Sequence, residues 1–334
     1  MQRCLFLKGK ILMNNILILS AGRRVELVEA FREAMLSLNI RGKVMCTDMS
    51  PELSSACQVA DGFFKVPRAT DEAYIDDLIA ICQSNSIKLV IPTIDTDLEK
   101  LSRAKDSFSN IGCHISIPDL TFVSACRDKR KTADLFQRLN IASPKIYDIN
   151  SIVFPCFCKP YNGSSSIGAF VLNNETDLTD DILNNMNNMY MELIGKDYVE
   201  VTVDCYFSKQ NELKCLVPRE RIETRSGEVS KGVTRKGRVY KYLLERLKKI
   251  PGVVGCVTVQ VFYNKDTGDI KGLEINPRFG GGYPLSYAAG ANYPLYLLKE
   301  YMSDECIDFI DDWEADLLML RYDAKVLSHE YPDI

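Results

Sequence analysis

The sequence predicts an α/β domain followed by an α+β domain, and three observations support this fold class. Over roughly the first third of the chain, short apolar runs alternate with segments of helical spacing, which is typical of a parallel sheet covered by helices. Beyond residue 120, apolar strands follow one another across turns with few helices between them, which favours antiparallel sheets. The 334 residues, 46% of them hydrophobic, suffice for two or three domains with cores of their own.

The first domain repeats a strand-and-helix rhythm. Its expected strands are 15–21, 43–48 and 88–95, and its expected helices are 24–40 and 76–87. Together they predict a Rossmann-like parallel sheet. Only Gly22 follows the first strand, where a dinucleotide-binding fingerprint needs three glycines, so a plain scaffold is favoured over a nicotinamide site. Open parallel sheets bind ligands at the carboxyl ends of their strands, where this chain has Arg23, Asp48, Asp95 and Asp97.

The second part opens with a charged amphipathic helix, predicted to run from residue 125 until Pro144 helps to end it. An Asn-rich segment, 180–192, is also expected to be helical. Apolar runs separated by turn residues predict the strands 152–160, 167–172, 197–207, 213–221, 254–264 and 269–279. These strands account for the antiparallel character of the second part.

Composition excludes several classes of protein. The formal net charge is −4 with both signs interleaved, so a nucleic-acid partner is not expected. The 12 cysteines are scattered without a C-x-x-C pair and only 2 histidines occur, which argues against a zinc site. Cys156 and Cys158 alternate along one expected strand and are interpreted as core thiols. Such cysteine usage fits a reducing compartment and predicts a cytoplasmic protein.

The N-terminal segment places basic residues ahead of apolar ones, as a signal peptide does. Charged and amide residues interrupt its apolar run and no small-residue cleavage site follows, so we interpret 15–21 as the first strand, with Met13 as an alternative start to Met1. No run of about 18 apolar residues occurs elsewhere, so neither a membrane span nor a membrane partner is expected.

A lysine followed by a donor-rich loop forms the first candidate site. Lys159 ends an apolar strand, and the loop after it contains Gly163, Ser164, Ser165, Ser166 and Gly168. Backbone amides and hydroxyls in such a turn can wrap phosphate oxygens, while the lysine supplies a fixed positive charge. A simple hairpin loop is the alternative, and the segment lacks the G-K-[ST] ending of a P-loop.

Three oxygen-bearing side chains form the second candidate site. Glu274 and Asn276 alternate on one strand face, and a hairpin would bring Gln260 beside them. Carboxylate and amide oxygens suit Mg²⁺, and Arg278 follows closely enough to meet an anion that the metal also touches. The alternative is a hairpin with solvent-facing polar residues.

Two further segments are weaker candidates. Glu192 and Asp197 bracket a short connection, Leu193–Ile194–Gly195, that could offer backbone amides to a planar base and a carboxylate to a ribose. The basic segment 217–236 is interpreted as a solvated loop, unless one of its cations reaches the substrate carboxylate or the γ-phosphate; its candidates for that role are Arg219, Arg225 and Lys231.

Together these segments resemble the ATP-grasp superfamily, most closely the synthetase units of the carbamoyl phosphate synthetase large subunit and its single-unit relatives. The resemblance runs in order from about Asn15 to about Pro294. The family's Asp-Lys ahead of a helix ending in I-x-x-P is similar to Asp128-Lys129 through Pro144. Its strand lysine and Gly/Ser loop resemble Lys159 with the loop described above. Its metal strands resemble Gln260 followed by Glu274-x-Asn276-x-Arg278.

The resemblance implies a domain division and a set of site residues. It implies a Rossmann-like pre-ATP-grasp domain at 1–120 and an ATP-grasp domain at 121–334, with a lid subdomain at about 130–192 and an antiparallel C-terminal subdomain. Lys129, Lys159 and the loop of Gly163, Ser164, Ser165 and Ser166 would hold ATP phosphates, and the hinge of Glu192, Leu193, Ile194 and Asp197 would hold the nucleoside. Gln260, Glu274 and Asn276 would bind Mg²⁺, with Mn²⁺ as an alternative metal. Arg278 and Lys159 would act in catalysis.

The implied activity is that of a ligase which uses ATP to activate a carboxylate as an acyl phosphate and then transfers the acyl group to an amine or similar nucleophile, releasing ADP and phosphate. Small-molecule carboxylate and amine substrates follow from this. An amino acid, a peptide, a sugar amine and bicarbonate all stay open as acceptor, and so does a homodimer. The alternatives are a catalytically silent ATP-binding or regulatory protein of the same fold and, from the first domain alone, an NAD-dependent oxidoreductase.

Overall fold

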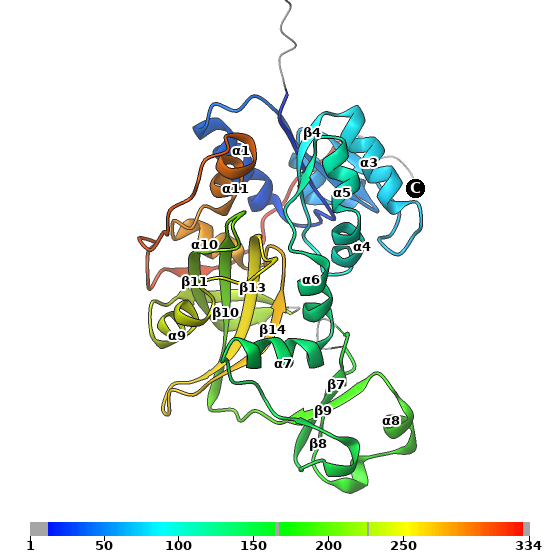
Figure 1. Ribbon diagram of the computed structural model, residues 1–334, viewed down its shortest axis with the longest axis vertical. Coiled ribbons are helices and arrows are strands. Elements are labelled where there is room, and N and C mark those ends of the chain that lie inside the picture. Colours follow the sequence, from blue (N-terminus) through cyan, green and yellow to red (C-terminus); the bar gives the residue numbers. More distant parts are fainter. Residues whose placement is uncertain (1–12, 164–166, 226, 330–334) are drawn as a thin grey trace, which may run out of the picture.

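The computed structural model describes residues 13–163, 167–225 and 227–329, and three β-sheets organise them (Figure 1). The first sheet belongs to an α/β domain, and the other two are antiparallel. The predicted fold class, α/β followed by α+β, is therefore confirmed. Among the residues described, no helix has the length and apolar character needed to cross a membrane.

The first sheet is parallel and has the strand order β3-β2-β1-β4-β5. Its strands are β1 (Asn15–Ile18), β2 (Val44–Asp48), β3 (Phe63–Lys65), β4 (Ile87–Ile91) and β5 (His114–Ile115). Its helices are α1 (Val25–Ser37), α2 (Ser55–Val59), α3 (Tyr74–Ser84), α4 (Leu98–Arg103) and α5 (Lys105–Asn110), with a 3₁₀ turn, η1 (Pro51–Leu53). Both faces are covered: Ile16 and Ile18 pack with α1, while Leu17 and Leu19 pack with residues of α3, α4 and α5. Such double burial explains why β1 is a continuous apolar run.

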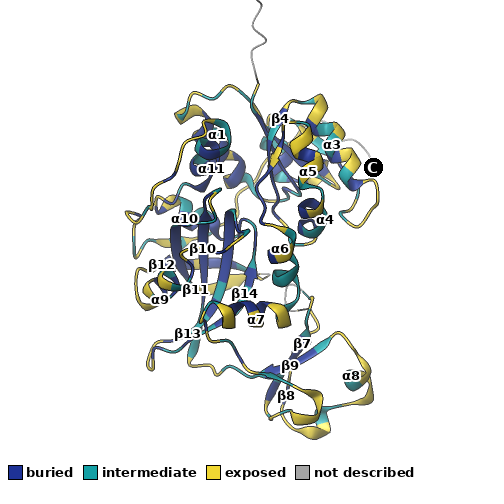
Figure 2. Cartoon of the chain, viewed as in Figure 1, coloured by how far each residue is buried: buried dark blue, intermediate teal, exposed yellow. Residues whose placement is uncertain are grey.

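The large antiparallel sheet has the order β14-β13-β10-β11-β12-β15 and forms the centre of the second part. Its strands are β10 (Tyr198–Phe207), β11 (Leu213–Arg225), β12 (Glu228–Thr234), β13 (Gly255–Asn264), β14 (Ile270–Asn276) and β15 (Leu318–Leu320). The helices of this region are α9 (Arg238–Arg246), α10 (Tyr283–Ala288) and α11 (Tyr293–Met302). Figure 2 shows that most of the strands in this sheet are buried.

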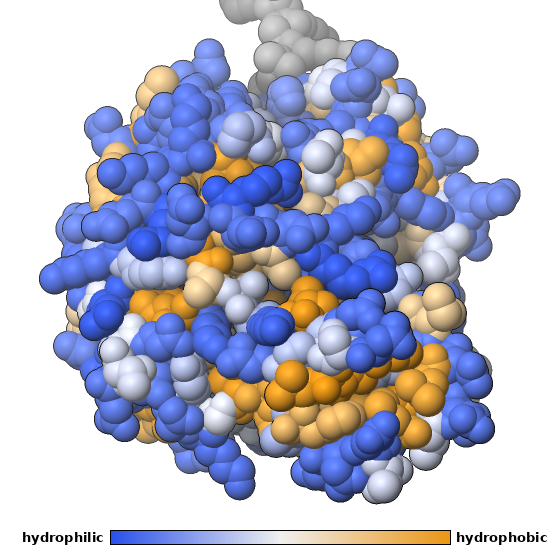
Figure 3. Space-filling view, turned by 60° about the horizontal axis from the view of Figure 1, so that its bottom comes forward, coloured by the Kyte–Doolittle hydropathy of each residue, from blue (hydrophilic) through white to orange (hydrophobic). Residues whose placement is uncertain are grey.

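A smaller antiparallel sheet, ordered β6-β9-β7-β8, forms a separate subdomain. It contains β6 (Ile146–Tyr147), β7 (Cys156–Pro160), β8 (Phe170–Leu172), β9 (Asn188–Glu192), helix α8 (Asp180–Asn184) and the 3₁₀ turns η2 (Ile149–Ser151) and η3 (Glu175–Asp177). Cys156 and Cys158 are fully buried in its core, as predicted. Figure 3 shows a largely hydrophilic face whose broadest apolar area lies in its lower right part, with smaller apolar areas elsewhere.

The predicted long helix from residue 125 is wrong. The structure has two helices there, α6 (Leu120–Arg127) and α7 (Lys129–Arg138), with Asp128 in an extended conformation between them. The Asp128 carboxylate accepts a hydrogen bond from the Arg130 amide at 2.9 Å and so caps α7. This break makes Lys129 the first residue of α7.

Two other predicted elements also differ. The prediction that segment 180–192 is helical is wrong for most of its length: the only helix in it is the short α8, and its end forms strand β9. Met189, Tyr190 and Met191 are buried on opposite faces of β9, which pairs with its neighbours in the sheet. The basic segment 217–236 is not a loop: most of it belongs to the hairpin of β11 and β12. Residues 217–219 are buried in β11, whereas residues 222–225 at its end are exposed.

Candidate active site

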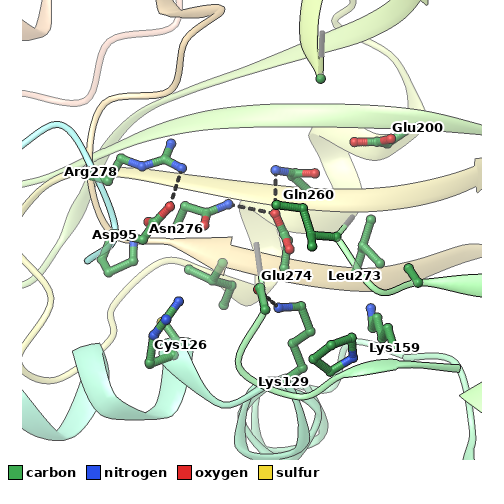
Figure 4. A pocket seen from close by; sticks show the side chains of 18 of the residues that line it. Asp95, Cys126, Lys129, Lys159, Glu200, Gln260, Leu273, Glu274, Asn276 and Arg278 are labelled. Atoms are coloured by element: carbon green, nitrogen blue, oxygen red, sulfur yellow. Dashed lines mark hydrogen bonds and ion pairs between the residues drawn. The ribbon is translucent and has the colours of Figure 1, made fainter. Parts of the chain in front are cut away.

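A cavity of about 670 Å³ lies where the α/β domain, the small sheet and the large sheet meet. Its walls come from the loop after β4, from α6 and α7, from β7 and from the strands β13 and β14. Figure 4 shows Arg278 and Asp95 at one end, Lys159 at the other, and Glu274 between them. The volume is in the range typical of small-molecule sites.

Two lysines, Lys129 and Lys159, bring positive charge to one side of the cavity. Lys159 on β7 is 8% exposed, and Lys129 on α7 donates a hydrogen bond from Nζ to the Gly163 carbonyl at 2.5 Å. Burial, and then the neighbouring charge of Lys129, lower the pKa of Lys159 to about 8. Burial also lowers the pKa of Lys129, although Glu274 partly opposes this. One buried and one half-buried ammonium group, both of lowered pKa, favour the binding of an anion beside them.

The predicted oxygen cluster comes together in the middle of the cavity. Gln260 on β13 faces Glu274 on β14 in the strand register, and its Nε2 donates to Glu274 Oε1 at 2.9 Å. The Nδ2 of Asn276 donates to the same oxygen at 2.9 Å. Rotation of either amide by a half-turn would present its oxygen instead, so the three side chains can supply three oxygen ligands to one cation.

Arg278 closes the other end of the cavity and pairs with the first domain. Its Nη2 lies 2.7 Å from Asp95 Oδ2, although Asp95 is 183 residues away in the sequence. Asp95 Oδ1 and Arg278 Nε are both buried, and neither has a hydrogen-bond partner among the described residues. Arg24 lies nearby: burial, and then the charge of Arg278, lower the pKa of Arg24 to about 10.

The three cations suggested for segment 217–236 do not reach the cavity. Arg219 is 2% exposed and forms a bidentate ion pair with Asp204, at 2.7 and 3.1 Å. Arg225 pairs with Asp323, and Lys231 pairs with Glu223 at 2.7 Å.

The sequence interpretation missed a different pair, Arg221 and Glu200, which contact each other and line the cavity. Polar residues at every second position of two paired strands could have identified it: Glu200, Thr202 and Asp204 on β10, and Arg219 and Arg221 on β11.

The buried pair of Arg219 and Asp204 also supports the glycine loop after Arg278. A Cβ atom on Gly282 would lie 2.2 Å from Arg219 Nη1, so only glycine permits this close approach. Ser286 donates a hydrogen bond to Asp204 at 2.6 Å. The ion pair of Arg219 and Asp204 therefore packs against the glycine loop that follows Arg278 and has a structural role there.

The predicted hinge residues lie outside the linings of both cavities found in the described residues. Glu192 Oε1 lies 2.5 Å from Lys271 Nζ, and Asp197 accepts a hydrogen bond from the Asn264 amide. A second, narrow cavity beside them is lined by Met191, which directly precedes Glu192, and by other apolar side chains of β6, β9 and α7. Leu193 and Ile194 continue the chain from there towards β10.

The glycine-serine loop is only partly described. Gly163 lines the large cavity and accepts the hydrogen bond of Lys129, and Gly168 adopts a φ of 74°. Ser164, Ser165 and Ser166 lie outside the described residues.

Two family models match the chain. One, described as "PylC-like, N-terminal domain", covers residues 16–116, and the other, described as "ATP-grasp in the biosynthetic pathway with Ter operon", covers residues 186–316. Residues 186–316 therefore match an ATP-grasp family, which agrees with the sequence motifs. No curated protein matches the chain.

Solved structures agree on the fold. Pyruvate carboxylase from Rhizobium etli is 14% identical with a TM-score of 0.69; the match covers 92% of this chain and 30% of that one. The biotin carboxylase domain of 2-oxoglutarate carboxylase from Hydrogenobacter thermophilus, in complex with MgADP and bicarbonate, is 12% identical with a TM-score of 0.71, covering 92% and 73%. L-amino acid ligase from Bacillus licheniformis is 17% identical with a TM-score of 0.64, covering 86% and 74%. This chain thus spans less than a third of the pyruvate carboxylase chain and nearly three quarters of the other two.

Proposed function

We propose that this protein is an ATP-dependent ligase that activates a carboxylate as an acyl phosphate and passes the acyl group to an amine or similar nucleophile. The observation that carries this proposal is the arrangement of charges along one cavity: Lys159 at one end, Lys129 beside the Glu274 cluster in the middle, and Arg278 at the other end. An anionic chain of phosphates needs cations at one end, and an anionic substrate needs a cation at the other.

The nucleotide would lie at the lysine end. Lys129 and Lys159 would contact phosphate oxygens, and Gly163, which accepts the hydrogen bond of Lys129, lies beside them. Met189, Met191 and Leu273 line a narrow cavity of about 10 Å³ beside Lys129 and Lys159, and a planar base would pack against their apolar side chains once the cavity widens. Glu192, Leu193, Ile194 and Asp197 follow directly and would supply the contacts to base and ribose.

A magnesium ion fits the middle of the cavity. Glu274, Asn276 and Gln260 would hold it, because a carboxylate and two amides form a set of hard oxygen donors. When bound, the ion would neutralise charge on the phosphates. Lys129, Lys159 and Arg278 would orient the reacting groups and offset the remaining charge.

Arg278 would hold the substrate carboxylate so that one of its oxygens attacks the γ-phosphoryl group and ADP leaves. The Arg278→Lys variant keeps the charge and loses the forked donor geometry, so we expect kcat for ADP release to fall by about tenfold or more with little change in ATP affinity. Product analysis tests the reaction type. AMP and pyrophosphate as the products would contradict the acyl-phosphate route.

A screen of carboxylates in the presence of ATP, Mg²⁺ and hydroxylamine tests the proposed function directly. Hydroxylamine traps acyl phosphates as hydroxamates, so a productive carboxylate should give hydroxamate and ADP in equal amounts. ATP binding without ADP release for every carboxylate would instead support the silent ATP-binding protein.

ATP affinity should also depend on pH through Lys159. Its pKa of about 8 means that the charge which attracts phosphate is present below pH 8 and is lost as the pH rises through that value. We therefore expect the Kd for ATP, measured by calorimetry from pH 7 to 9.5, to rise above pH 8. The Lys159→Arg variant keeps its charge throughout and should flatten this rise, whereas an equal slope in both proteins would assign the titration to another group.

The lowered pKa of Lys159 also determines how the stability of the nucleotide-free protein changes with pH. The unfolded chain keeps the lysine proton up to about pH 10.4, whereas the native state releases it near pH 8. Because the unfolded state binds more protons between these values, this group makes the native state more stable as the pH rises across that window.

A further inference from the structure

The carboxylates that line the large cavity differ in how fully their oxygens are engaged. Glu274 accepts hydrogen bonds from two amides, Glu200 pairs with Arg221, and Glu99 accepts a hydrogen bond from the Ser124 hydroxyl at 2.6 Å. Asp95 uses only Oδ2, towards Arg278, and its Oδ1 is buried without a partner in the described part of the chain. A buried carboxylate oxygen without a donor is costly, so its presence points to a ligand that supplies one.

The position of Asp95 indicates the role in the reaction of the ligand that would donate to its free oxygen. Asp95 belongs to the loop after β4, at the carboxyl end of the parallel sheet, and it contacts the arginine that would hold the substrate carboxylate. Lys159 lies at the opposite end of the cavity, and Lys129 lies below Glu274, between Lys159 and Asp95 (Figure 4). A nucleophile bound by Asp95 would therefore lie beside the carboxylate that Arg278 would hold, within the same cavity as its acyl carbon.

Other groups on this edge of the sheet cannot do the same. Asp97 is fully buried and accepts hydrogen bonds from Ser20, Tyr74 and Thr96. Burial also raises the pKa of Asp97, so it is a poorer partner for a cation. Asp48 accepts a hydrogen bond from the Gly22 amide and does not line the cavity.

We infer that Asp95 binds the acyl acceptor and that this acceptor is a primary amine carrying a positive charge, which rests on the proposed ligase function. An ammonium group supplies the hydrogen-bond donors that the free oxygen of Asp95 lacks, together with the complementary charge, whereas bicarbonate brings a second anion to that oxygen. Among the acceptors that the sequence left open, the inference selects amines and rejects bicarbonate.

The chemical step balances with Asp95 as the first proton acceptor. The ammonium group gives one proton to Asp95, and the free amine attacks the acyl carbon. A C–N bond forms as the bond between the acyl carbon and the phosphate oxygen breaks. The second proton of the amine leaves with the phosphate, and Asp95 returns its proton to solvent. Asp95 is thus a catalytic residue for the second half-reaction only.

The Asp95→Asn variant separates this role from a structural one. Asparagine can still accept the hydrogen bond from Arg278 through its side-chain oxygen, but it has no negative charge and takes no proton. Asp106 is exposed, belongs to the same domain and lies outside the cavity lining, so Asp106→Asn is the matched control for loss of one charge.

The experiment compares two nucleophiles with any carboxylate that gives hydroxamate in the screen above. Hydroxylamine is uncharged at neutral pH, whereas ammonium, methylammonium and the α-amino acids carry a cationic amine. For Asp95→Asn we expect amide formation from the best cationic amine to fall by about tenfold or more, while hydroxamate formation stays within about threefold of the wild type. The Asp106→Asn variant should match the wild type with both.

The outcomes distinguish the inference from the proposed function. Equal losses with both nucleophiles would show that Asp95 acts only through Arg278, and no loss with either would show that it does not contact the acceptor. If the wild type forms hydroxamate but forms no amide from any cationic amine, the inference that the acceptor is positively charged would be wrong. Absence of both hydroxamate and ADP with every carboxylate would overturn the ligase function itself.

Discussion

Replacing Glu274 with alanine is expected to lower ATP-dependent turnover by more than about 100-fold while the protein stays folded. Glu274 is the one carboxylate of the proposed metal cluster, and both amides of that cluster donate to it. Its side chain faces the cavity and packs into no core, so its loss removes a ligand and creates no void in the interior.

The measurement is ADP release across a range of Mg²⁺ concentrations, together with thermal unfolding of each variant. Glu274→Gln keeps the shape and removes the charge, so it should also be inactive. Glu245 on α9 has a side chain that is 74% exposed, and Glu245→Ala is the control that should retain full activity. Turnover close to that of the wild type in Glu274→Ala at saturating Mg²⁺ would remove Glu274 from the metal site.

The second large effect concerns stability. Asp204→Ala should lower the free energy of unfolding by about 3–5 kcal/mol, because it leaves the guanidinium of Arg219 buried without its counter-charge. The double variant Asp204→Leu, Arg219→Met buries no charge and should recover much of this loss. Chemical denaturation of the three proteins measures both differences.

An exposed ion pair provides the matched comparison. Asp323 pairs with Arg225, and their side chains are 80% and 59% exposed, so Asp323→Ala should leave the unfolding transition unchanged. A small effect of Asp204→Ala would mean that Arg219 finds another partner once Asp204 is lost. In that case the glycine loop after Arg278 would have to be held by other contacts.

Local patterns in the sequence were sufficient for the architecture and for part of the candidate site. The continuous apolar run of β1 and the helical spacing of α1 identify a doubly covered sheet, because burial on both faces requires that pattern. The alternation of Glu274 and Asn276, with a hairpin leading back to Gln260, fixes three side chains on one face of two paired strands. Short-range geometry determines both results.

The tertiary structure decided what depends on contacts between distant segments. The strand at β9 and the burial of Arg219 each follow from neighbours that the local sequence does not contain, whereas Asp128 caps α7 locally. The same applies to the pairing of Asp95 with Arg278, which joins the first domain to the metal-binding strands. Residue type and spacing determine which side chains share one face of a helix or strand. Whether a charged side chain is buried, and with which residue it pairs, depends on the chain segment that packs against it. That segment is in place only when the domains come together.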